Sequence, residues 1–241
     1  MTTDPLAPLL DLVDVRPALE KARAEADSAM RHRSLRRSGG AVAAELGLRS
    51  AVASAALEGH AYDLEEVRNG LVTDPVVQGS LRAAAALDGL AATWTKAPRQ
   101  VLAKLHTLIA RDLVPADQLG RPVAAGARLD ALMAVVAGRS TAPALLQAAV
   151  VHGELLALRA FAGPNGVLAR AAGRLTLISG GLDPRGLLAV DVGHQRREPE
   201  YVGASGSFAT GTPDGVRAWL KHCAAAVEEA AAALVEVGEL V

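Results

Sequence analysis

Apolar residues recur along most of this chain at the three- and four-residue spacing that places them on one face of a helix. In the stretch 16–30, this face carries Leu19, Ala22, Ala26 and Ala29. The alternation of apolar and polar residues that is typical of half-buried strands is scarce. The spacing, together with Gly, Pro and helix-capping residues, predicts roughly ten helices. They are expected at 16–30, 41–57, 63–69, 76–94, 99–111, 127–137, 143–160, 167–178, 184–192 and 214–235.

The connections between these helices are short, which favours an all-α fold in a single compact bundle. Two segments, 113–125 and 199–211, are rich in turn residues or lack a helical pattern, and we expect them to be irregular. The clearest internal break is Ser38-Gly39-Gly40. We therefore expect an N-terminal helical arm at 1–39, followed by a helical domain at 40–241.

The composition narrows the function classes. Apolar residues make up 51% of the 241 residues and aromatic residues only 2%, and Ala and Leu, both good helix formers, dominate. The formal net charge of -1 provides no global field that would recruit nucleic acid or an anionic membrane. No stretch approaches the roughly 18 uninterrupted apolar residues of a membrane span, and Asp and Pro interrupt the N-terminus, unlike a signal peptide. We therefore expect a cytoplasmic protein without a membrane or nucleic-acid partner.

Few of the common chemical motifs are present. The single cysteine, Cys223, excludes an internal disulfide and a cysteine-based metal cage, and we interpret it as a buried, inert thiol. His60, His152 and His194 lack the spacing of a helical zinc site. The dinucleotide, P-loop and hydrolase-elbow motifs are absent from the sequence. The basic cluster 31–37 is either a phosphate-binding patch or the solvated end of a helix.

One stretch carries a resemblance to a known family. Residues 152–170 read HGELLALRAFAGPNGVLAR. This resembles the Fic family signature H-x-F-x-[DE]-G-N-G-R-x-x-R, with Phe161, Asn165, Gly166 and Arg170 at matching positions. The resemblance implies the all-helical Fic fold and a role in moving AMP from ATP onto a hydroxyl of another protein.

A second motif strengthens this resemblance. Residues 54–59 read SAALEG and resemble the family's inhibitory helix motif, [ST]-x-x-x-E-[GN], with Glu58 as the acidic residue. In the family this glutamate pairs with the second arginine of the signature, so the resemblance implies an ion pair between Glu58 and Arg170. The resemblance extends over about residues 40 to 235.

The departures from the signature fall on residues that the family's reaction needs. Adenylyl transfer requires a base, a metal ion and groups that hold the phosphates in line. Arg159 replaces the base His and stays protonated at any ordinary pH. Gly163 replaces the acidic metal ligand, Pro164 replaces a glycine and has no backbone N–H, and Val167 replaces an arginine. Each loss could cost a factor of about 100 or more, so ordinary adenylyl transfer is not expected.

The leading interpretation is therefore a degenerate Fic-like pseudoenzyme that acts by binding a protein partner, with no metal or cofactor expected beyond weak ATP binding. The alternative is a transferase with altered chemistry, whose nucleotide or nucleotide-sugar donor is held by Arg159, Asn165, Gly166 and Arg170. These residues also have an architectural interpretation: Gly166 allows a turn, Asn165 caps the following helix, and Glu58 and Arg170 form an internal strut. Because family members often form dimers, the resemblance also implies a homodimer.

Two further residues near the loop have alternative roles. His152 lies two helical turns before Arg159 and is either a displaced base or a hydrogen-bonded core residue. Phe161 is expected to anchor the loop in the core, because a lone aromatic residue is a large packing group.

Overall fold

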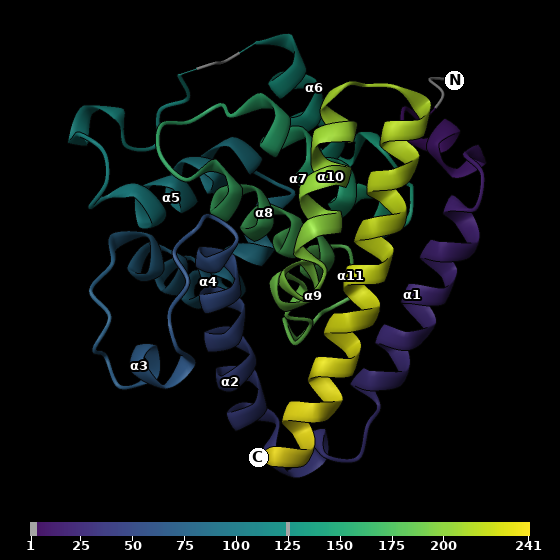
Figure 1. Ribbon diagram of the computed structural model, residues 1–241. Coiled ribbons are helices and arrows are strands. Elements are labelled where there is room, and N and C mark those ends of the chain that lie inside the picture. Colours follow the sequence, from purple (N-terminus) through teal and green to yellow (C-terminus); the bar gives the residue numbers. More distant parts are fainter. Residues whose placement is uncertain (1–3, 124–125) are drawn as a thin grey trace.

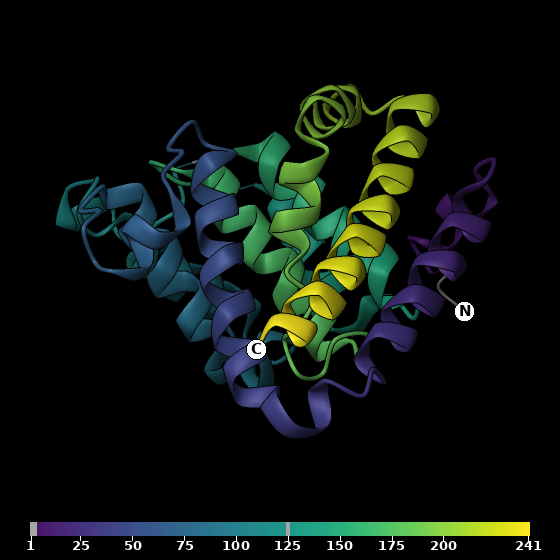
Figure 2. The same ribbon diagram turned by 60° about the horizontal axis from the view of Figure 1, so that its bottom comes forward.

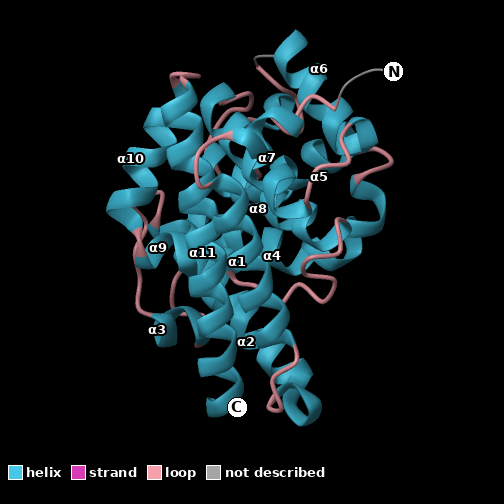
Figure 3. Cartoon of the chain, turned by 90° about the vertical axis from the view of Figure 1, so that its right-hand side faces the viewer, coloured by secondary structure: helices cyan, strands magenta, loops and turns pink. Residues whose placement is uncertain are grey.

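The computed structural model describes residues 4–123 and 126–241, without the side chains of residues 36–38. Within these residues the chain forms eleven α-helices and three shorter helical segments, and no strand (Figures 1 and 3). The α-helices are α1 (Val15–Met30), α2 (Leu35–Ala56), α3 (Leu64–Arg68), α4 (Pro75–Trp94), α5 (Pro98–Ala110), α6 (Ala127–Ala134), α7 (Ala144–Leu158), α8 (Asn165–Ser179), α9 (Val190–Arg196), α10 (Glu198–Ala209) and α11 (Pro213–Leu240). The short segments are η1 (Ala7–Asp11), η2 (Ala116–Gln118) and η3 (Val135–Arg139). The predicted all-α fold class is confirmed.

Local signals explain where several helices begin. Helices α4, α5 and α11 start at a proline, whose fixed φ suits the first helical position and whose missing N–H is not needed there. The Asp63 side chain accepts hydrogen bonds from two backbone N–H groups at the start of α3, and Asp74 does the same for α4. The observed starts of these helices agree with the sequence prediction, because the proline or aspartate that marks each start lies within the first helical turn or next to it.

Helix α8 lies at the centre of the molecule. Its residues from Asn165 to Leu177 are all buried, and α2, α4, α5 and α7 each pack against it. Helices α9 and α10 pack on α11, and α1 runs alongside α11 (Figures 1 and 2). The two tryptophans, Trp94 and Trp219, are fully buried in this core. A central helix with buried polar residues is therefore held by neighbours on several sides.

Three segments differ from the sequence prediction. Helix α2 continues through 38–40, so the break expected there is wrong, although the division into an arm and a domain at residue 39 stays a prediction. The helix expected at 184–192 is instead a turn, in which the Asp183 carboxylate accepts from the N–H groups of Leu187 and Leu188, before α9 begins at Val190.

The segment 199–211 was expected to be irregular, but most of it forms α10. Its buried residues Tyr201, Ala204 and Phe208 pack inward on one face. Burial of these side chains stabilises a helix whose own residues are weak helix formers.

In the described part of the chain, none of the helices has both the length and the apolar surface that crossing a membrane requires.

Candidate functional site

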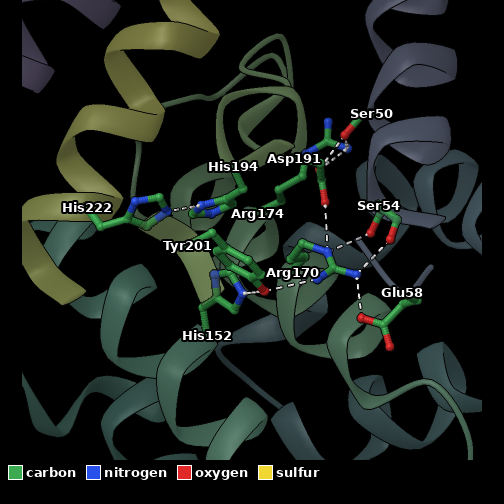
Figure 4. A network of polar contacts seen from close by, with 10 residues as sticks. All are labelled: Ser50, Ser54, Glu58, His152, Arg170, Arg174, Asp191, His194, Tyr201 and His222. Atoms are coloured by element: carbon green, nitrogen blue, oxygen red, sulfur yellow. Dashed lines mark hydrogen bonds and ion pairs between the residues drawn. The ribbon is translucent and has the colours of Figure 1, made fainter. Parts of the chain in front are cut away.

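Arg170 of α8 lies at the centre of a buried polar network (Figure 4). Its Nε donates to Ser54 Oγ at 2.9 Å, and its Nη1 donates to the Tyr201 hydroxyl at 2.9 Å. Its Nη2 donates to the Ser54 carbonyl at 2.8 Å and to Glu58 Oε1 at 2.9 Å. The Arg170 side chain is 2% exposed. The structure thus brings the 54–59 motif, at the C-terminal end of α2, against the last residue of the loop signature.

A second group of charges continues this network. Asp191 of α9 lies 3.7 Å from Arg170 Nε and 3.8 Å from Arg174 Nη1. Ser50 Oγ donates to Asp191 and accepts from Arg174 Nη1 at 2.8 Å. Asp191 and both arginines are buried. Two buried guanidinium groups therefore face the carboxylates of Asp191 and Glu58, which is the pairing that makes such burial tolerable.

The Glu58 carboxylate lies against the first turn of α8. A Cβ added at Gly166 would lie 1.8 Å from Glu58 Oε1 and 3.0 Å from Arg170 Nη1, so only glycine fits there. Gly166 itself does not have a positive φ, so the expected turn conformation is wrong and close approach is the reason for glycine. Because the N-terminal end of a helix favours negative charge, Glu58 lies where an anion is stabilised.

Asn165 holds the shape of the loop. Its Oδ1 accepts from the N–H of Phe161 at 3.1 Å, and its Nδ2 donates to the carbonyls of Phe161 at 2.7 Å and Gly163 at 3.0 Å. The expectation that Asn165 caps the following helix is therefore wrong, because its side chain binds the preceding loop instead. Phe161 is buried, and its ring lies 4.8 Å from that of His106.

His106 adds a second tie to the loop. Its Nδ1 accepts from the N–H of Gly120 at 2.9 Å, so its Nε2 carries the hydrogen that is donated to the Ala162 carbonyl at 2.7 Å. The loop backbone is thus held from both the α5 side and the α8 side.

The positions that depart from the signature have distinct surroundings. Arg159 ends α7 in the left-handed region, with φ 44° and ψ 46°, and its side chain is exposed. Gly163 also has a positive φ of 84°. Val167 is buried in the core. Whether Arg159, Asn165, Gly166 and Arg170 can share one anion stays a prediction, and in the closed loop Arg170 is engaged with Ser54, Glu58 and Tyr201.

His152 is a core residue. It is buried, and its Nε2 lies 3.1 Å from the Tyr201 hydroxyl. Since Arg170 donates to the Tyr201 oxygen, the Tyr201 O–H can donate to His152 Nε2. Burial, followed by the charge of Arg170, lowers the pKa of His152 well below 6.5. These contacts match the core alternative rather than the displaced base.

The residues present do not fit the magnesium ion that the resemblance implies. Gly163 offers no carboxylate, Glu58 is engaged with Arg170, and the nearby Glu154 is paired with Arg128 at 2.6 Å. Across the ranges that the structure describes, no group of three or more His, Cys, Asp or Glu side chains is placed to hold a metal ion. Hard cations such as magnesium need such oxygen ligands.

Sequence reasoning missed Ser50, Arg174, Asp191 and Tyr201. Ser50 lies four residues before Ser54 on α2, and Arg174 lies four residues after Arg170 on α8. This spacing places each row on one helix face and could have been noticed. Asp191 and Tyr201 come from distant helices, and no local pattern indicates that they join the site.

Comparison with known proteins identifies the fold. No family model matches the sequence, and no curated protein matches it either. Among solved structures, a Fic family protein from Desulfovibrio desulfuricans G20 is similar, with 23% identity, a TM-score of 0.70, and coverage of 93% of this chain and 76% of that chain. Fic-1 from C. elegans is similar as well, with 18% identity, a TM-score of 0.73, and coverage of 96% and 74%. A variant of that C. elegans protein also matches, at 18% identity and a TM-score of 0.71.

This chain therefore has the Fic fold, in agreement with the resemblance seen in its loop and inhibitory-helix motifs.

Proposed function

We propose that this Fic-fold protein does not transfer AMP by the usual route of the family and acts by binding a protein partner. One observation carries the proposal: the loop offers Arg159 and Gly163 where that route needs a base and a metal ligand. A guanidinium group cannot accept the proton of a target hydroxyl, because it stays protonated. Gly163 has no side chain to hold a divalent cation.

The contacts of Glu58 support the same proposal. Its carboxylate lies against Gly166 and hydrogen-bonds to the buried Arg170. A phosphate that approached the first turn of α8 would compete with this carboxylate for the same positive helix end. The pair therefore favours a closed, structural use of the loop.

Labelled ATP provides the test. The protein and its Glu58→Ala variant are incubated with magnesium and ATP labelled in the α-phosphate, alone and with cell extract, and labelled protein is detected by gel and intact mass. We expect no labelled product from either protein. Label that appears with the native chain and disappears with Arg159→Met would show that the loop catalyses transfer and would overturn the proposal. Arg159 is exposed, so this variant is expected to fold.

A second candidate rests on the exposure of Arg159. The exposed guanidinium at the end of α7 can bind a diphosphate through two parallel hydrogen bonds and can replace the charge of a metal ion. The function would then be a transferase that uses a nucleotide or nucleotide-sugar donor. A thermal-shift panel of ATP, UDP-sugars, GDP-sugars and CMP-sugars separates the two functions. A strong shift with one sugar donor that Arg159→Met removes would favour the transferase, whereas a weak shift with ATP alone fits the binding protein.

The proposal includes the cellular location and the oligomeric state of the protein. We expect the protein to act in the cytoplasm and, by analogy with the family, as a homodimer. Sedimentation equilibrium measures the mass in solution, and a monomer at micromolar concentration would refute the dimer.

A further inference from the structure

Three histidines from three helices meet in the core below α10. His152 of α7, His194 of α9 and His222 of α11 are 4%, 2% and 0% exposed. The ring centroids of His152 and His194 are 4.9 Å apart, and those of His194 and His222 are 5.1 Å apart. Figure 4 shows His222 facing His194, and His152 below them with Tyr201. The ring centroids of Trp219 and Tyr201 lie 4.9–6.2 Å from those of all three histidines. We call these three residues the histidine cluster.

The hydrogen bonds of the histidine cluster require at least one neutral ring in the His194–His222 pair and favour a neutral His152. His194 Nδ1 lies 3.0 Å from His222 Nε2, and one of these two nitrogens must accept. The Tyr201 hydroxyl can donate to His152 Nε2 while its oxygen accepts from Arg170. Protonation of His152 would remove the acceptor of the Tyr201 O–H and would add a second positive charge close to the buried Arg170.

The charges around the histidine cluster also disfavour protonation. Arg170 of α8 faces His152 and His194, and Arg197, just before α10, acts on His222. Two carboxylates oppose this effect. Glu200 of α10 is 45% exposed, and its Oε1 lies 3.4 Å from His222 Nδ1. The buried Asp191 of α9 lines the same cavity as His152 and His194, and Arg170 and Arg174 lie beside it there. Burial lowers the pKa of His152 and His194 well below 6.5 and lowers that of His222, which Glu200 partly offsets. The neutral form of the histidine cluster is thus the form that fits the closed core.

Helix α10 packs on the histidine cluster and has a sequence with a low intrinsic tendency to form a helix. Its twelve residues, EPEYVGASGSFA, include two glycines and two serines, and both residue types are poorer helix formers than alanine. It is held mainly by its buried face, where Tyr201 contacts the histidines and Phe208 contacts Trp219. It is followed by Gly211 at a positive φ of 71°, where the chain turns into α11. Local opening of this helix would expose the histidines to water without disturbing α4 or α5.

We propose that the histidine cluster is an acid-sensitive latch: its neutral rings hold α10 in place, and their protonation releases α10 together with the hydrogen bond from Arg170 to Tyr201. The latch does not depend on the proposed function, because it concerns only the closing of α10. Release of α10 would also change the polar network at Arg170, because Tyr201 contacts both the histidine cluster and Arg170. Acidification would therefore loosen the contacts of Arg170 from the side opposite Glu58.

Hydrogen exchange followed by mass spectrometry tests this proposal on the full-length protein at pH 7.5 and pH 5.5, with exchange times scaled for the intrinsic rates. Each histidine that takes up no proton in the closed form, and whose pKa in the open form is about 6.5, makes opening about tenfold more favourable over this range. His152 and His194 together predict a loss of protection of about 100-fold in peptides of α10. Peptides of α4 serve as the internal reference and should change little.

Three variants sharpen the test. His194→Gln removes one titrating ring, so the loss of protection in α10 should shrink to about tenfold. Glu200→Gln alters an exposed residue and removes the carboxylate that compensates protonated His222, so α10 should open more at pH 5.5. His32→Gln alters a half-buried histidine between α1 and α2, and its α10 peptides should behave as those of the native protein.

Three outcomes would overturn the proposal. One is an α10 that keeps its protection at pH 5.5. Another is equal loss of protection in α10 and α4, which would mean global unfolding. The third is a full 100-fold effect that persists in His194→Gln.

Discussion

The two partners of the Glu58–Arg170 ion pair are expected to differ in how much their removal lowers the free energy of unfolding. Removal of Arg170 should cost clearly more than removal of Glu58. The Glu58 side chain is 24% exposed and loses one hydrogen bond when it is truncated to alanine. Arg170 then keeps both hydrogen bonds to Ser54, the one to Tyr201, and Asp191 at 3.7 Å. A hydrogen bond to a charged group contributes about 1.5–3 kcal/mol, so Glu58→Ala should lower the free energy of unfolding by that amount.

Arg170→Met is a larger perturbation. It removes four hydrogen bonds and leaves the Ser54 and Tyr201 acceptors buried without their donor. It also leaves the buried Asp191 with Arg174 as its remaining cation. Breaking a buried ion pair from one side costs about 3–5 kcal/mol, and we expect Arg170→Met at the upper end of that range.

Urea unfolding at pH 7, followed by circular dichroism, measures both changes. For a chain of this length about 1 kcal/mol corresponds to a shift of about 2–4 °C in Tm, which gives an independent check. Glu20→Ala, an exposed glutamate on α1, is the matched control and should stay within about 0.5 kcal/mol of the native protein. The reasoning fails if Glu58→Ala costs as much as Arg170→Met, or if it costs no more than Glu20→Ala.

Three further predictions follow from the loop and the core. Gly166→Ala should destabilise the protein by about 1.5–3 kcal/mol, because its Cβ displaces the Glu58 carboxylate, and this cost should be smaller in the Glu58→Ala background, where the closer of its two contacts is gone; additive costs in the double variant would contradict the contact. Asn165→Ala removes three hydrogen bonds to the loop and should cost about 1–3 kcal/mol and speed proteolytic cleavage between α7 and α8; an unchanged cleavage rate would argue against its role. Burial raises the pKa of Cys223 well above its usual value, so the folded protein should not react with a thiol reagent at pH 8 and should react fully in urea.

The fold was predictable where the signals are local. Prolines and aspartates at the starts of α3, α4 and α5 act within one turn, and the sequence places these helices within a few residues. Helix α10 was not predictable in this way, because its glycines and serines argue against a helix and only the packing of Tyr201 and Phe208 in the assembled core reverses that preference.

The candidate site likewise contains residues that the sequence predicted and residues that only the packing of the helices brings in. The encounter of Glu58 with Arg170 was expected from the two family motifs, not from any physical pattern in the sequence. Asp191, Tyr201 and the histidine cluster come from α7, α9, α10 and α11, and their approach depends on how those helices pack. Sequence reasoning also explained the glycine at position 166 wrongly. It considered the backbone conformation, whereas the structure shows that the Glu58 carboxylate lies against this residue and leaves no room for a side chain.

The left-handed backbone at Arg159 and Gly163 limits how this loop could be redesigned. An engineer who wished to install a base and a metal-binding carboxylate would place His at 159 and Asp at 163, where φ is 44° and 84°. Residues other than glycine are strained in that region, Asp less than most, so the new Asp at φ 84° would cost stability. Asn165 and His106 hold that backbone from both sides. Revival by point substitution should therefore fail, and transplanting residues 159–167 as one piece is the sounder strategy.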